Sequence, residues 1–351
     1  MNGNRQPDIR SLSRPDIDAF FSEIGEKPFR AKQVYEWLWK KGCRSFDEMS
    51  NLPVSLREKL SGAFSLPGIV ISSRQLSRDG TIKVGFRLFD GLLIEGVLIP
   101  SEGRTTACIS TQAGCALGCT FCATATLGFH RNLTAAEIVD QVRELDTLSQ
   151  EIHQISLSNI VLMGMGEPLV NYPQVKRAVE LITGEEGMGL SPQRITLSTV
   201  GIPKVIRQLA EDRFKPHLAI SLHAATDTLR DRIIPFNRQH PLAELTDALV
   251  FYHQKTGKRV TIEYLLLKDV NDTLDDARAL AEFCRSFPVK INLIEFNPVE
   301  GIPFHRAEMR RMKAFRDFLE SRNLVVNIRQ SRGKDIDAAC GQLAGRTPRS
   351  N

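Results

Sequence analysis

Three cysteines, Cys115, Cys119 and Cys122, lie close together in the stretch GCALGCTFCATATLGFHRNLT, which covers residues 114–134. Because they occur at C-x3-C-x2-C spacing in one glycine-flanked loop, their thiols can converge on a single centre. A structural zinc site normally takes four protein ligands, and no second pair of Cys or His follows nearby, which disfavours zinc. Three cysteines on a cubic [4Fe–4S] cluster instead leave one iron without a protein ligand. The spacing therefore predicts an iron–sulfur centre with one open, reactive iron, and a chance gathering of thiols is the alternative.

The four remaining cysteines are Cys43, Cys108, Cys284 and Cys340. An odd total of seven, in a chain without an export signal, argues against a disulfide framework and for reduced thiols. Cys43 ends an N-terminal helical pattern and Cys284 lies on a helix, so packing explains both. From the residues alone, Cys108 is a buried strand residue. A single late cysteine such as Cys340 is most often inert.

A second stretch, VLMGMGEP at residues 161–168, ends a run with the character of a buried strand. Its glycines let the backbone approach a ligand closely, and Glu167 can accept hydrogen bonds from an ammonium group. A glycine-bearing turn with one glutamate is usually only a turn. Because this one follows the cysteine loop by one strand–helix unit, it predicts the binding site of a cofactor amino group.

Strand-like runs alternate with amphipathic helical patterns from about residue 105 onward. The strand candidates span residues 106–111, 159–166, 194–201, 217–224, 260–267, 290–298 and 325–331, and the helix candidates span residues 134–149, 172–184, 202–213, 242–257, 273–287 and 307–323. Apolar strands that alternate with helices predict a parallel sheet with right-handed crossovers. Six such units predict an α/β fold with a partial (β/α)6 TIM-like barrel. Polar residues follow these strands, at the edge where barrel active sites lie: Glu167, Ser198, Ser221, His223 and Asn297.

The pattern divides the chain into four parts. Residues 1–66 read as a small helical domain, and residues 67–100 as β-rich runs separated by turns that connect two parts. Residues 101–330 form the barrel, and residues 331–351 form a tail that carries Cys340. The tail has no strong reason to be buried, so we expect it to be flexible.

The helical domain carries the best candidate surface for nucleic acid. In RAKQVYEWLWKKG, residues 30–42, the apolar face is predicted to hold Val34, Trp37 and Leu38, and Gly42 ends the helix. Basic and aromatic residues are interleaved there, which suits contacts to phosphates and stacking on bases: Arg30, Lys32, Lys40, Lys41 and Arg44 with Tyr35, Trp37 and Trp39. The alternative is a solvated helix face over an aromatic core.

Composition sets broad limits on function. The 351 residues are 42% hydrophobic and 25% charged, as in an ordinary globular enzyme. A net charge of +5 permits RNA as a partner without requiring it. No stretch approaches the ~20 apolar residues of a membrane span, and no secretory signal is present. We therefore expect a cytoplasmic protein without membrane contact, by default a monomer.

The cysteine motif, with Phe121 directly before its last cysteine, resembles the signature of radical S-adenosylmethionine (radical SAM) enzymes. Nearly the whole chain, from FRAKQVYEWLW to CGQLAG, resembles the RlmN family of dual-specificity RNA methyltransferases. The matched motifs include EGVLIP, MGMGEPLVN, ITLSTVG, AISLHAATD and INLIEFNP. The resemblance implies methylation of C2 of one adenine in 23S rRNA, at the peptidyl-transferase centre, and of one in the tRNA anticodon loop.

The resemblance also implies a set of site residues. Cys115, Cys119 and Cys122 would hold the [4Fe–4S] cluster, and its open iron would chelate S-adenosylmethionine. The contacts to that cofactor would be Gly166, Glu167, Ser198, Ser221, Leu222, His223 and Asn297. Taken alone, His223 would be a structural histidine.

The implied mechanism uses a covalent carrier and two molecules of S-adenosylmethionine per turnover. Cys340 would first become S-methylcysteine, and a 5′-deoxyadenosyl radical would then activate its methyl group for addition to adenine. Cys108 would form a disulfide with Cys340 as the crosslink to RNA breaks. Glu95 in IEGVLIP would accept the proton, with an exposed strand carboxylate as its alternative. An electron donor such as flavodoxin and its reductase would be needed.

Three other functions stay open at this point. The sister activity methylates C8 of the same adenine, confers antibiotic resistance and shares the cluster and both thiols. The GMGEP motif and the DIDAACGQLAG tail favour C2. A non-methylating radical enzyme, such as an activase for a glycyl-radical protein, would not need Cys340. An iron–sulfur electron carrier or RNA-binding scaffold would not cleave the cofactor.

Overall fold

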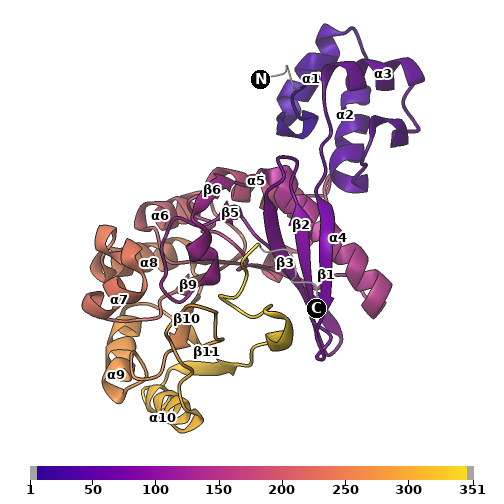
Figure 1. Cartoon of the computed structure of the whole chain (residues 1–351). Coiled ribbons are helices and arrows are strands. Elements are labelled where there is room, and N and C mark those ends of the chain that lie inside the picture. Colours follow the sequence, from indigo (N-terminus) through magenta and orange to yellow (C-terminus); the bar gives the residue numbers. More distant parts are fainter. Residues whose placement is uncertain (1–5, 346–351) are drawn as a thin grey trace.

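The computed structural model describes residues 6–345. Residues 1–5 of the helical domain and 346–351 of the tail lie outside the described residues. Three α-helices, α1 (Arg14–Glu23), α2 (Pro28–Glu36) and α3 (Val54–Ala63), form a small lobe that stands beside the rest of the chain (Figure 1). The lobe packs around Phe21, Leu56 and Leu60, none of which is exposed. The predicted small helical domain is therefore present as a separate layer of helices.

The helix after Pro28 does not continue regularly to Gly42. It changes into a π-helical turn, η2 (Trp37–Lys41), in which the N–H groups of Gly42 and Cys43 both reach the carbonyl of Trp37. The wider turn rotates the side chains that follow it. In this turn Leu38 and Trp39 are buried and Trp37 is half-buried, with Lys41 Nζ 3.7 Å from the Trp37 ring centroid. Trp37 packs against the same core as Val34 and Leu38, as predicted. Trp39, at 1% exposure, is no stacking surface.

One ten-stranded sheet organises the larger part of the described chain, in the order β1-β2-β3-β4-β7-β8-β9-β10-β11-β12. Its strands are β1 (Val70–Leu76), β2 (Ile82–Arg87), β3 (Leu93–Ser101), β4 (Arg104–Cys108), β7 (Asn159–Leu162), β8 (Ile195–Thr199), β9 (His217–Ser221), β10 (Val260–Leu266), β11 (Val289–Glu295) and β12 (Val325–Arg329). The strands from β4 to β12 pair in parallel, and the sheet has two ends, so the barrel is partial, as predicted.

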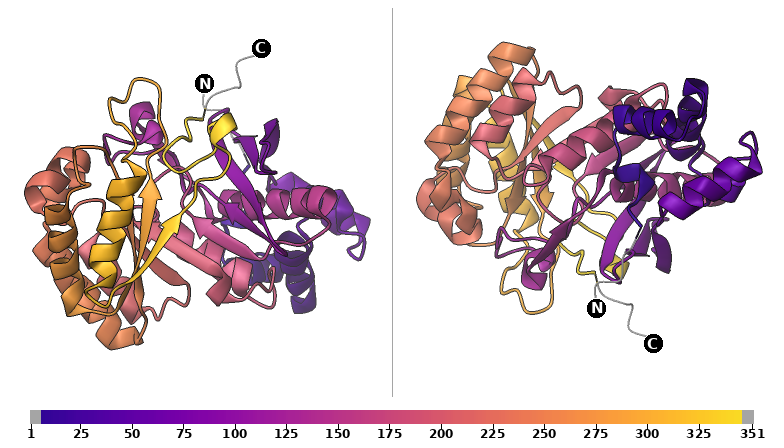
Figure 2. Two further views of the ribbon diagram at one scale, coloured as in Figure 1. Left: turned by 90° about the horizontal axis from the view of Figure 1, so that it is seen from below. Right: turned by 90° about the horizontal axis from the view of Figure 1, so that it is seen from above.

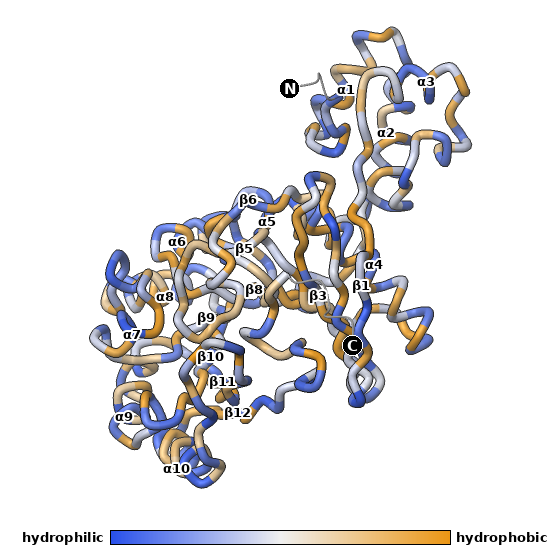
Figure 3. Tube along the Cα trace, in the orientation of Figure 1, coloured by the Kyte–Doolittle hydropathy of each residue, from blue (hydrophilic) through white to orange (hydrophobic). Residues whose placement is uncertain are grey.

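The β-rich segment of residues 67–100 is more than a connection. Strands β1, β2 and β3 form an antiparallel meander, and β3 pairs with β4 from Val97↔Cys108 to Ser101↔Arg104. The meander therefore extends the barrel sheet directly. Hydrophobic residues gather along β3, where Ile94, Val97 and Leu98 are buried (Figure 3).

Helices cover the outer side of the parallel strands, and Figure 2 shows this layer from two sides. They are α4 (Ala135–His153), α5 (Tyr172–Thr183), α6 (Pro203–Glu211), α7 (Asp227–Ile233), α8 (Leu242–Thr256), α9 (Leu274–Phe283) and α10 (Met309–Glu320). All except α7 were predicted. Capping boxes start two of them, Thr134 with Glu137 at α4 and Thr273 with Asp276 at α9.

Short segments complete the fold. The small hairpin of β5 (Gln112–Gly114) and β6 (Phe129–Asn132) encloses the cysteine loop. The short helical segments are η1 (Ile9–Ser11), η3 (Phe46–Glu48), η4 (Ala123–Leu127), η5 (Pro192–Arg194), η6 (Pro235–Gln239), η7 (Cys284–Ser286) and η8 (Lys334–Ile336). Within residues 6–345, no helix has the length and apolar character needed to cross a bilayer.

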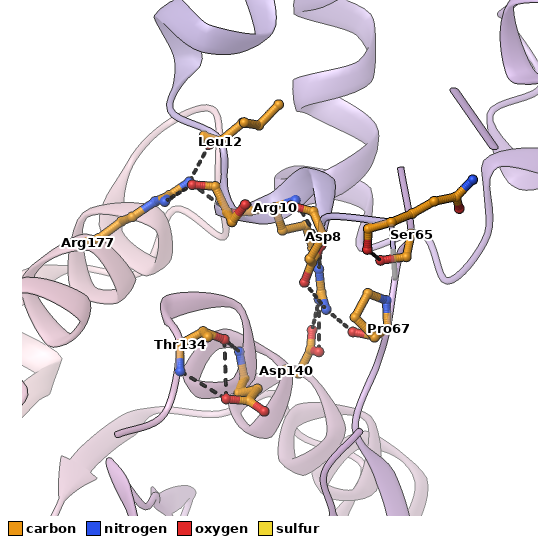
Figure 4. A network of polar contacts seen from close by, with 11 residues as sticks. Asp8, Arg10, Leu12, Ser65, Pro67, Thr134, Asp140 and Arg177 are labelled. Carbon is orange, nitrogen blue, oxygen red and sulfur yellow. Dashed lines mark hydrogen bonds and ion pairs between the residues drawn. The ribbon is translucent and has the colours of Figure 1, made fainter. Parts of the chain in front are cut away.

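A buried ionic network joins the helical lobe to the barrel (Figure 4). Arg10 Nη1 donates to both carboxylate oxygens of Asp140 on α4, each at 2.9 Å, and its other branch reaches the carbonyl of Pro67. Arg10 therefore links the N-terminal segment of the lobe to α4 of the barrel and to the segment at Pro67 that leads out of the lobe. Arg177 on α5 adds hydrogen bonds to the carbonyls of Arg10 and Ser11 at 2.9 Å. The network fixes the entry and exit segments of the helical lobe against α4 and α5.

We expect the substitution Arg10→Met to lower the free energy of unfolding by about 3–5 kcal/mol, because it leaves Asp140 buried without its partner. The side chains of Arg10 and Asp140 are only 6% and 7% exposed. Urea unfolding followed by circular dichroism measures the loss. Arg14→Met is the control, since Arg14 pairs with the half-exposed Asp18 and should lose well under about 1 kcal/mol. Equal losses in the two variants would contradict the role assigned to Arg10.

Candidate active site

A cavity of about 320 Å³ opens at the carboxyl ends of the parallel strands. The cysteine loop, the ends of β7, β8 and β9, and the C-terminal tail all contribute to its wall. The predicted site residues that line it are Cys108, Cys115, Cys119, Cys122, Gly166, Glu167, Ser198, Ser221, His223 and Cys340. Three predicted residues, Glu95, Leu222 and Asn297, lie outside its lining. Residues separated by more than 230 positions thus meet at one edge of the sheet, the edge predicted from the strand pattern.

The cysteine loop is held in place by local hydrogen bonds. The backbone N–H of Cys115 donates to Gly128 O at 2.8 Å, which closes the loop at the β5–β6 hairpin. Burial raises the pKa of Cys119 well above its ordinary value, and the nearby Cys122 and Cys115 thiolates raise it further. The three sulfur atoms are therefore close enough to interact electrostatically. Without a positive centre between them, they favour the protonated form.

The three thiols nevertheless stay apart. Within the described residues, no three His, Cys, Asp or Glu side chains are close enough together to bind one metal ion. A cubic cluster takes each of its cysteines on a different iron, so it requires separated sulfurs around one space. Cys115, Cys119 and Cys122 all line the cavity, so it is there that they would hold such a cluster.

Glu167 lies at the bottom of the cavity and is 3% exposed. Its two carboxylate oxygens accept the backbone N–H groups of Leu169 and Val200, each at 2.9 Å. Burial raises the pKa of Glu167, and these hydrogen bonds and one from Thr199 work in the opposite direction. A carboxylate has about four acceptor positions, so Glu167 keeps capacity for an ammonium group.

The backbone can place Glu167 here only because residue 166 is a glycine. Its φ is +97°, and a Cβ there would lie 2.4 Å from the Cβ of Gln112. The side chain of Gln112 in turn accepts the backbone N–H of Glu167 at 2.8 Å. Only glycine fits this close approach between the two segments.

Ser198 and Ser221 lie beside each other at the ends of β8 and β9, with their hydroxyl oxygens 3.1 Å apart. His223 follows, with φ +58°, and its Nδ1 accepts the backbone N–H of Leu265 at 3.0 Å. Burial, together with the nearby Arg230 charge, lowers the pKa of His223 to about 3, so the ring is neutral near pH 7. Its neutral ring meets the edge of Phe121 at a centroid distance of 4.9 Å. His223 is thus a fixed part of the wall.

Leu222 and Asn297 do not line the cavity themselves but contact residues that do. Leu222 is fully buried, and its backbone N–H bonds Glu263 O at 3.0 Å. Asn297 donates to Ser331 Oγ at 3.0 Å, and Ser331 lines the cavity. The Oδ1 atom of Asn297 is buried and has no hydrogen-bond partner among the described residues. This free acceptor and the acceptor capacity of Glu167 fit a cofactor that carries amino and hydroxyl donors.

Residues 331–345, the described part of the tail, are docked, contrary to the flexible segment that was expected. Ala123 N donates to Gly341 O and Thr124 Oγ1 donates to Leu343 O, both at 2.7 Å. Leu343 is 5% exposed. At the other end of the tail, Ser77 Oγ donates to Asp335 at 2.5 Å. Packing of small residues against the cysteine loop and the meander supplies the reason for burial, and it leaves the exposed Cys340 at the cavity.

Cys108 and Glu95 meet the tail from the sheet. Cys108 ends β4 and is 8% exposed. Burial, together with the neighbouring Cys340, raises the pKa of Cys108 to about 12. Glu95 is buried rather than an exposed strand carboxylate, and it accepts the backbone N–H of Ala344 at 2.7 Å. Lys83 Nζ lies 3.6 Å from its other oxygen.

Three charged residues that line the cavity were absent from the sequence-based prediction, namely Arg332 and the hydrogen-bonded pair of Arg329 and Glu263. Arg329 is the last residue of β12, so the rule that polar residues follow the strands would have found it. Glu263 is a charged residue inside the apolar run VTIEYLLL of β10, which is itself a signal of a buried functional pair. Their hydrogen bond, at 3.3 Å, joins two strands that are not neighbours.

Comparisons with known proteins agree with this arrangement. Residues 8–66 match the model of the ribosomal RNA large subunit methyltransferase N-terminal domain, and residues 109–284 match that of the radical SAM superfamily. The chain is 49% identical to a probable dual-specificity RNA methyltransferase RlmN of Christiangramia forsetii, with 98% of each chain covered. It is 46% identical to the dual-specificity RNA methyltransferase RlmN of Anaeromyxobacter dehalogenans, covering 96% of this chain and 92% of that one.

A solved structure is similar over nearly the whole chain. The crystal structure of a radical SAM methyltransferase from Sphaerobacter thermophilus aligns with a TM-score of 0.91 at 40% identity, covering 97% of this chain and all of the other. The similarity therefore includes the helical lobe, the meander and the barrel together.

Proposed function

The chain belongs to the RlmN family of dual-specificity RNA methyltransferases, and from this membership we propose that it methylates C2 of a specific adenine in 23S rRNA and in tRNA. It is a radical SAM RNA methyltransferase, a class that uses a [4Fe–4S] cluster and S-adenosylmethionine. The observation that carries the proposal is that Cys108 and Cys340 line the same cavity as the three clustered cysteines. An electron carrier or an activase has no need of two further thiols there.

Cys115, Cys119 and Cys122 would hold the cluster, and Glu167 would accept the amino group of the cofactor. The cluster and S-adenosylmethionine supply, when bound, a 5′-deoxyadenosyl radical after one-electron reduction. Gly166 lets the backbone pass close to the cofactor, and Ser198, Ser221 and the neutral His223 form the wall on the side of β8 and β9. Leu222 would support the wall between Ser221 and His223, and Asn297 would act through its free Oδ1.

Cys340 would be the methyl carrier. The adenine C2 carbon is electron-poor, so it does not attack the methyl group of S-adenosylmethionine directly. The thiolate of Cys340 would take the methyl group first: a bond forms from its sulfur to the methyl carbon, and the methyl–sulfonium bond breaks. Its exposure at the cavity is consistent with contact to both a cofactor and an RNA base. Two molecules of S-adenosylmethionine would then be used per turnover.

Cys108 would resolve the crosslink between protein and RNA by forming a disulfide with Cys340. The electrostatic coupling between the two thiols supports this pairing. Glu95 would accept the proton lost from adenine. Because Glu95 is capped by Ala344 N–H, this role requires the end of the tail to move away.

The remaining parts would serve the substrate. Residues 1–66 would act as an accessory RNA-binding domain, using the basic residues of α2 and its flanks. Residues 67–100 would connect that domain to the barrel of residues 101–330, and the tail of residues 331–351 would bring in the carrier cysteine. A flavodoxin and its reductase would supply the electron, and the working unit would be a monomer.

The test is the identity of the methylated nucleoside. The anaerobically reconstituted protein is incubated with S-adenosylmethionine, a reductant and protein-free ribosomal RNA. Chromatography with mass spectrometry then compares the nucleosides with 2-methyladenosine and 8-methyladenosine standards. We expect 2-methyladenosine, and transfer RNA as a second substrate should give the same product. Formation of 8-methyladenosine would show the sister activity, and cofactor cleavage without any methylated adenosine would overturn the proposed substrate.

A further inference from the structure

Arg329 reaches across the mouth of the barrel. From the end of β12, its Nη1 atom lies 3.3 Å from Glu263 Oε2 on β10 and 3.8 Å from Met163 Sδ, just after β7. Met163 contributes a backbone hydrogen bond to the thiol of Cys108. The guanidinium group is therefore held between strands on opposite sides of the cavity, next to the end of β4.

Glu263 anchors this guanidinium group and is itself fixed. The carboxylate is 3% exposed, and its Oε1 accepts Asn292 Nδ2 at 2.9 Å. Asn292 is the partner of Glu263 in the β10–β11 register. With both oxygens engaged, Glu263 holds the Nη1 branch of the guanidinium group by one hydrogen bond. Such a fork fixed by a carboxylate loses little freedom when it binds a second anion.

The other nitrogen atoms of the guanidinium group can donate further hydrogen bonds. Among the described residues, its Nε and Nη2 atoms have no hydrogen-bond acceptor, although Arg329 lines the cavity. The two thiols in the same wall, Cys108 and Cys340, are the groups whose chemistry produces a negative charge there. Burial alone would lower the pKa of Arg329, yet the pKa is raised because Cys340, Glu263 and Cys108 lie within electrostatic range.

We propose that Arg329, oriented by Glu263, stabilises the thiolate of Cys340 for attack on the methyl group of S-adenosylmethionine. The inference rests on the proposed function, since it assigns a residue to the first methyl transfer. In that step the electron pair of the thiolate forms the new sulfur–carbon bond, and the pair of the broken bond remains on S-adenosylhomocysteine. The negative charge of the thiolate and the positive charge of the sulfonium cancel as the bond forms. Arg329 therefore acts before this step, because it favours the ionised form of Cys340 that attacks.

The experiment measures this step without radical chemistry. Anaerobically reconstituted protein is mixed with methyl-labelled S-adenosylmethionine in the absence of reductant and RNA, and the label on the Cys340 peptide is followed by mass spectrometry. In parallel, iodoacetamide alkylation of Cys340 near neutral pH reports thiolate reactivity without using the cofactor. We expect Arg329→Met to slow both reactions by about tenfold, and Arg329→Lys to restore part of the rate.

The matched control is Arg332→Met, because Arg332 is an exposed arginine that lines the same cavity three residues later. It should change both rates by less than about twofold. Equal rates in Arg329→Met and Arg332→Met would overturn the inference. If Arg329→Met does not fold, the double variant Arg329→Gln with Glu263→Gln keeps a neutral hydrogen-bonded pair and should show the same slow alkylation.

The two proposals fail in different ways. If the wild-type Cys340 peptide never acquires label, the carrier role and the proposed function fail, and the alkylation rates still decide whether Arg329 activates the thiol. If the wild-type peptide is labelled and Arg329→Met is labelled equally fast, only the role of Arg329 is wrong.

Discussion

The variant Cys340→Ala should lose RNA methylation by at least about a thousandfold while it continues to cleave S-adenosylmethionine when reduced. Without the thiol no methyl group can be stored on the protein, yet the three cluster cysteines and the cofactor contacts remain. The tail should still dock, because its hydrogen bonds use the backbone of Gly341, Leu343 and Ala344. Methylated nucleosides and 5′-deoxyadenosine are measured in the same reaction mixtures.

The control for this prediction is Cys284→Ala. Cys284 is 4% exposed and packs in the core below α9, away from the cavity, so its loss should leave both products within about twofold and cost about 1 kcal/mol of stability. Retained RNA methylation in Cys340→Ala would contradict the carrier mechanism. It would favour an enzyme of the radical SAM class that transfers methyl groups without a protein thioether.

Substitution of Cys119 by alanine should have a wider effect, with loss of both cofactor cleavage and RNA methylation by at least about a thousandfold. Cys119 lies between its two partners in the loop and interacts electrostatically with each. Removal of one of three thiolates should leave the cluster unstable. Iron content, visible absorbance and 5′-deoxyadenosine formation provide the readouts.

Cys119→Ala also tests whether the C-x3-C-x2-C motif is the site that binds the cluster. If Cys119→Ala keeps its iron and its cleavage activity, the cluster is bound elsewhere and the C-x3-C-x2-C motif has another role. The same Cys284→Ala control applies, because it removes a buried thiol without touching the loop. If Cys340→Ala cleaves the cofactor and Cys119→Ala does not, the loop cysteines serve cofactor cleavage and Cys340 serves methyl transfer.

Local sequence signals were sufficient for most elements of the barrel. The apolar runs of residues 260–267 and 290–298 became β10 and β11, and the helix expected at residues 134–149 begins at its capping box with Thr134. Such signals depend on neighbours within a few positions, which the sequence displays directly. The meeting of polar residues at one sheet edge followed from parallel pairing alone.

Other features depended on contacts that no local pattern contains. Trp39, within the π-turn at Trp37–Lys41, is buried rather than available for stacking, and the meander β1–β3 joined the barrel sheet through β4. An irregular turn and a strand pairing are decided by the packing of distant segments, so a periodicity of 3.6 or 2 residues does not predict them.

The sequence by itself determined the chemistry available to this protein: three thiols at cluster spacing, a glycine–glutamate turn, and two further cysteines. The tertiary structure alone decided which of these groups meet. It docked the described part of the tail at the cavity through bonds to the cysteine loop and to Glu95, and it set Arg329 and Glu263 in the same cavity wall as the thiols. The physical reason is that side-chain types are local properties, whereas burial, charge pairing and shared cavities arise only when segments far apart in the chain are packed together.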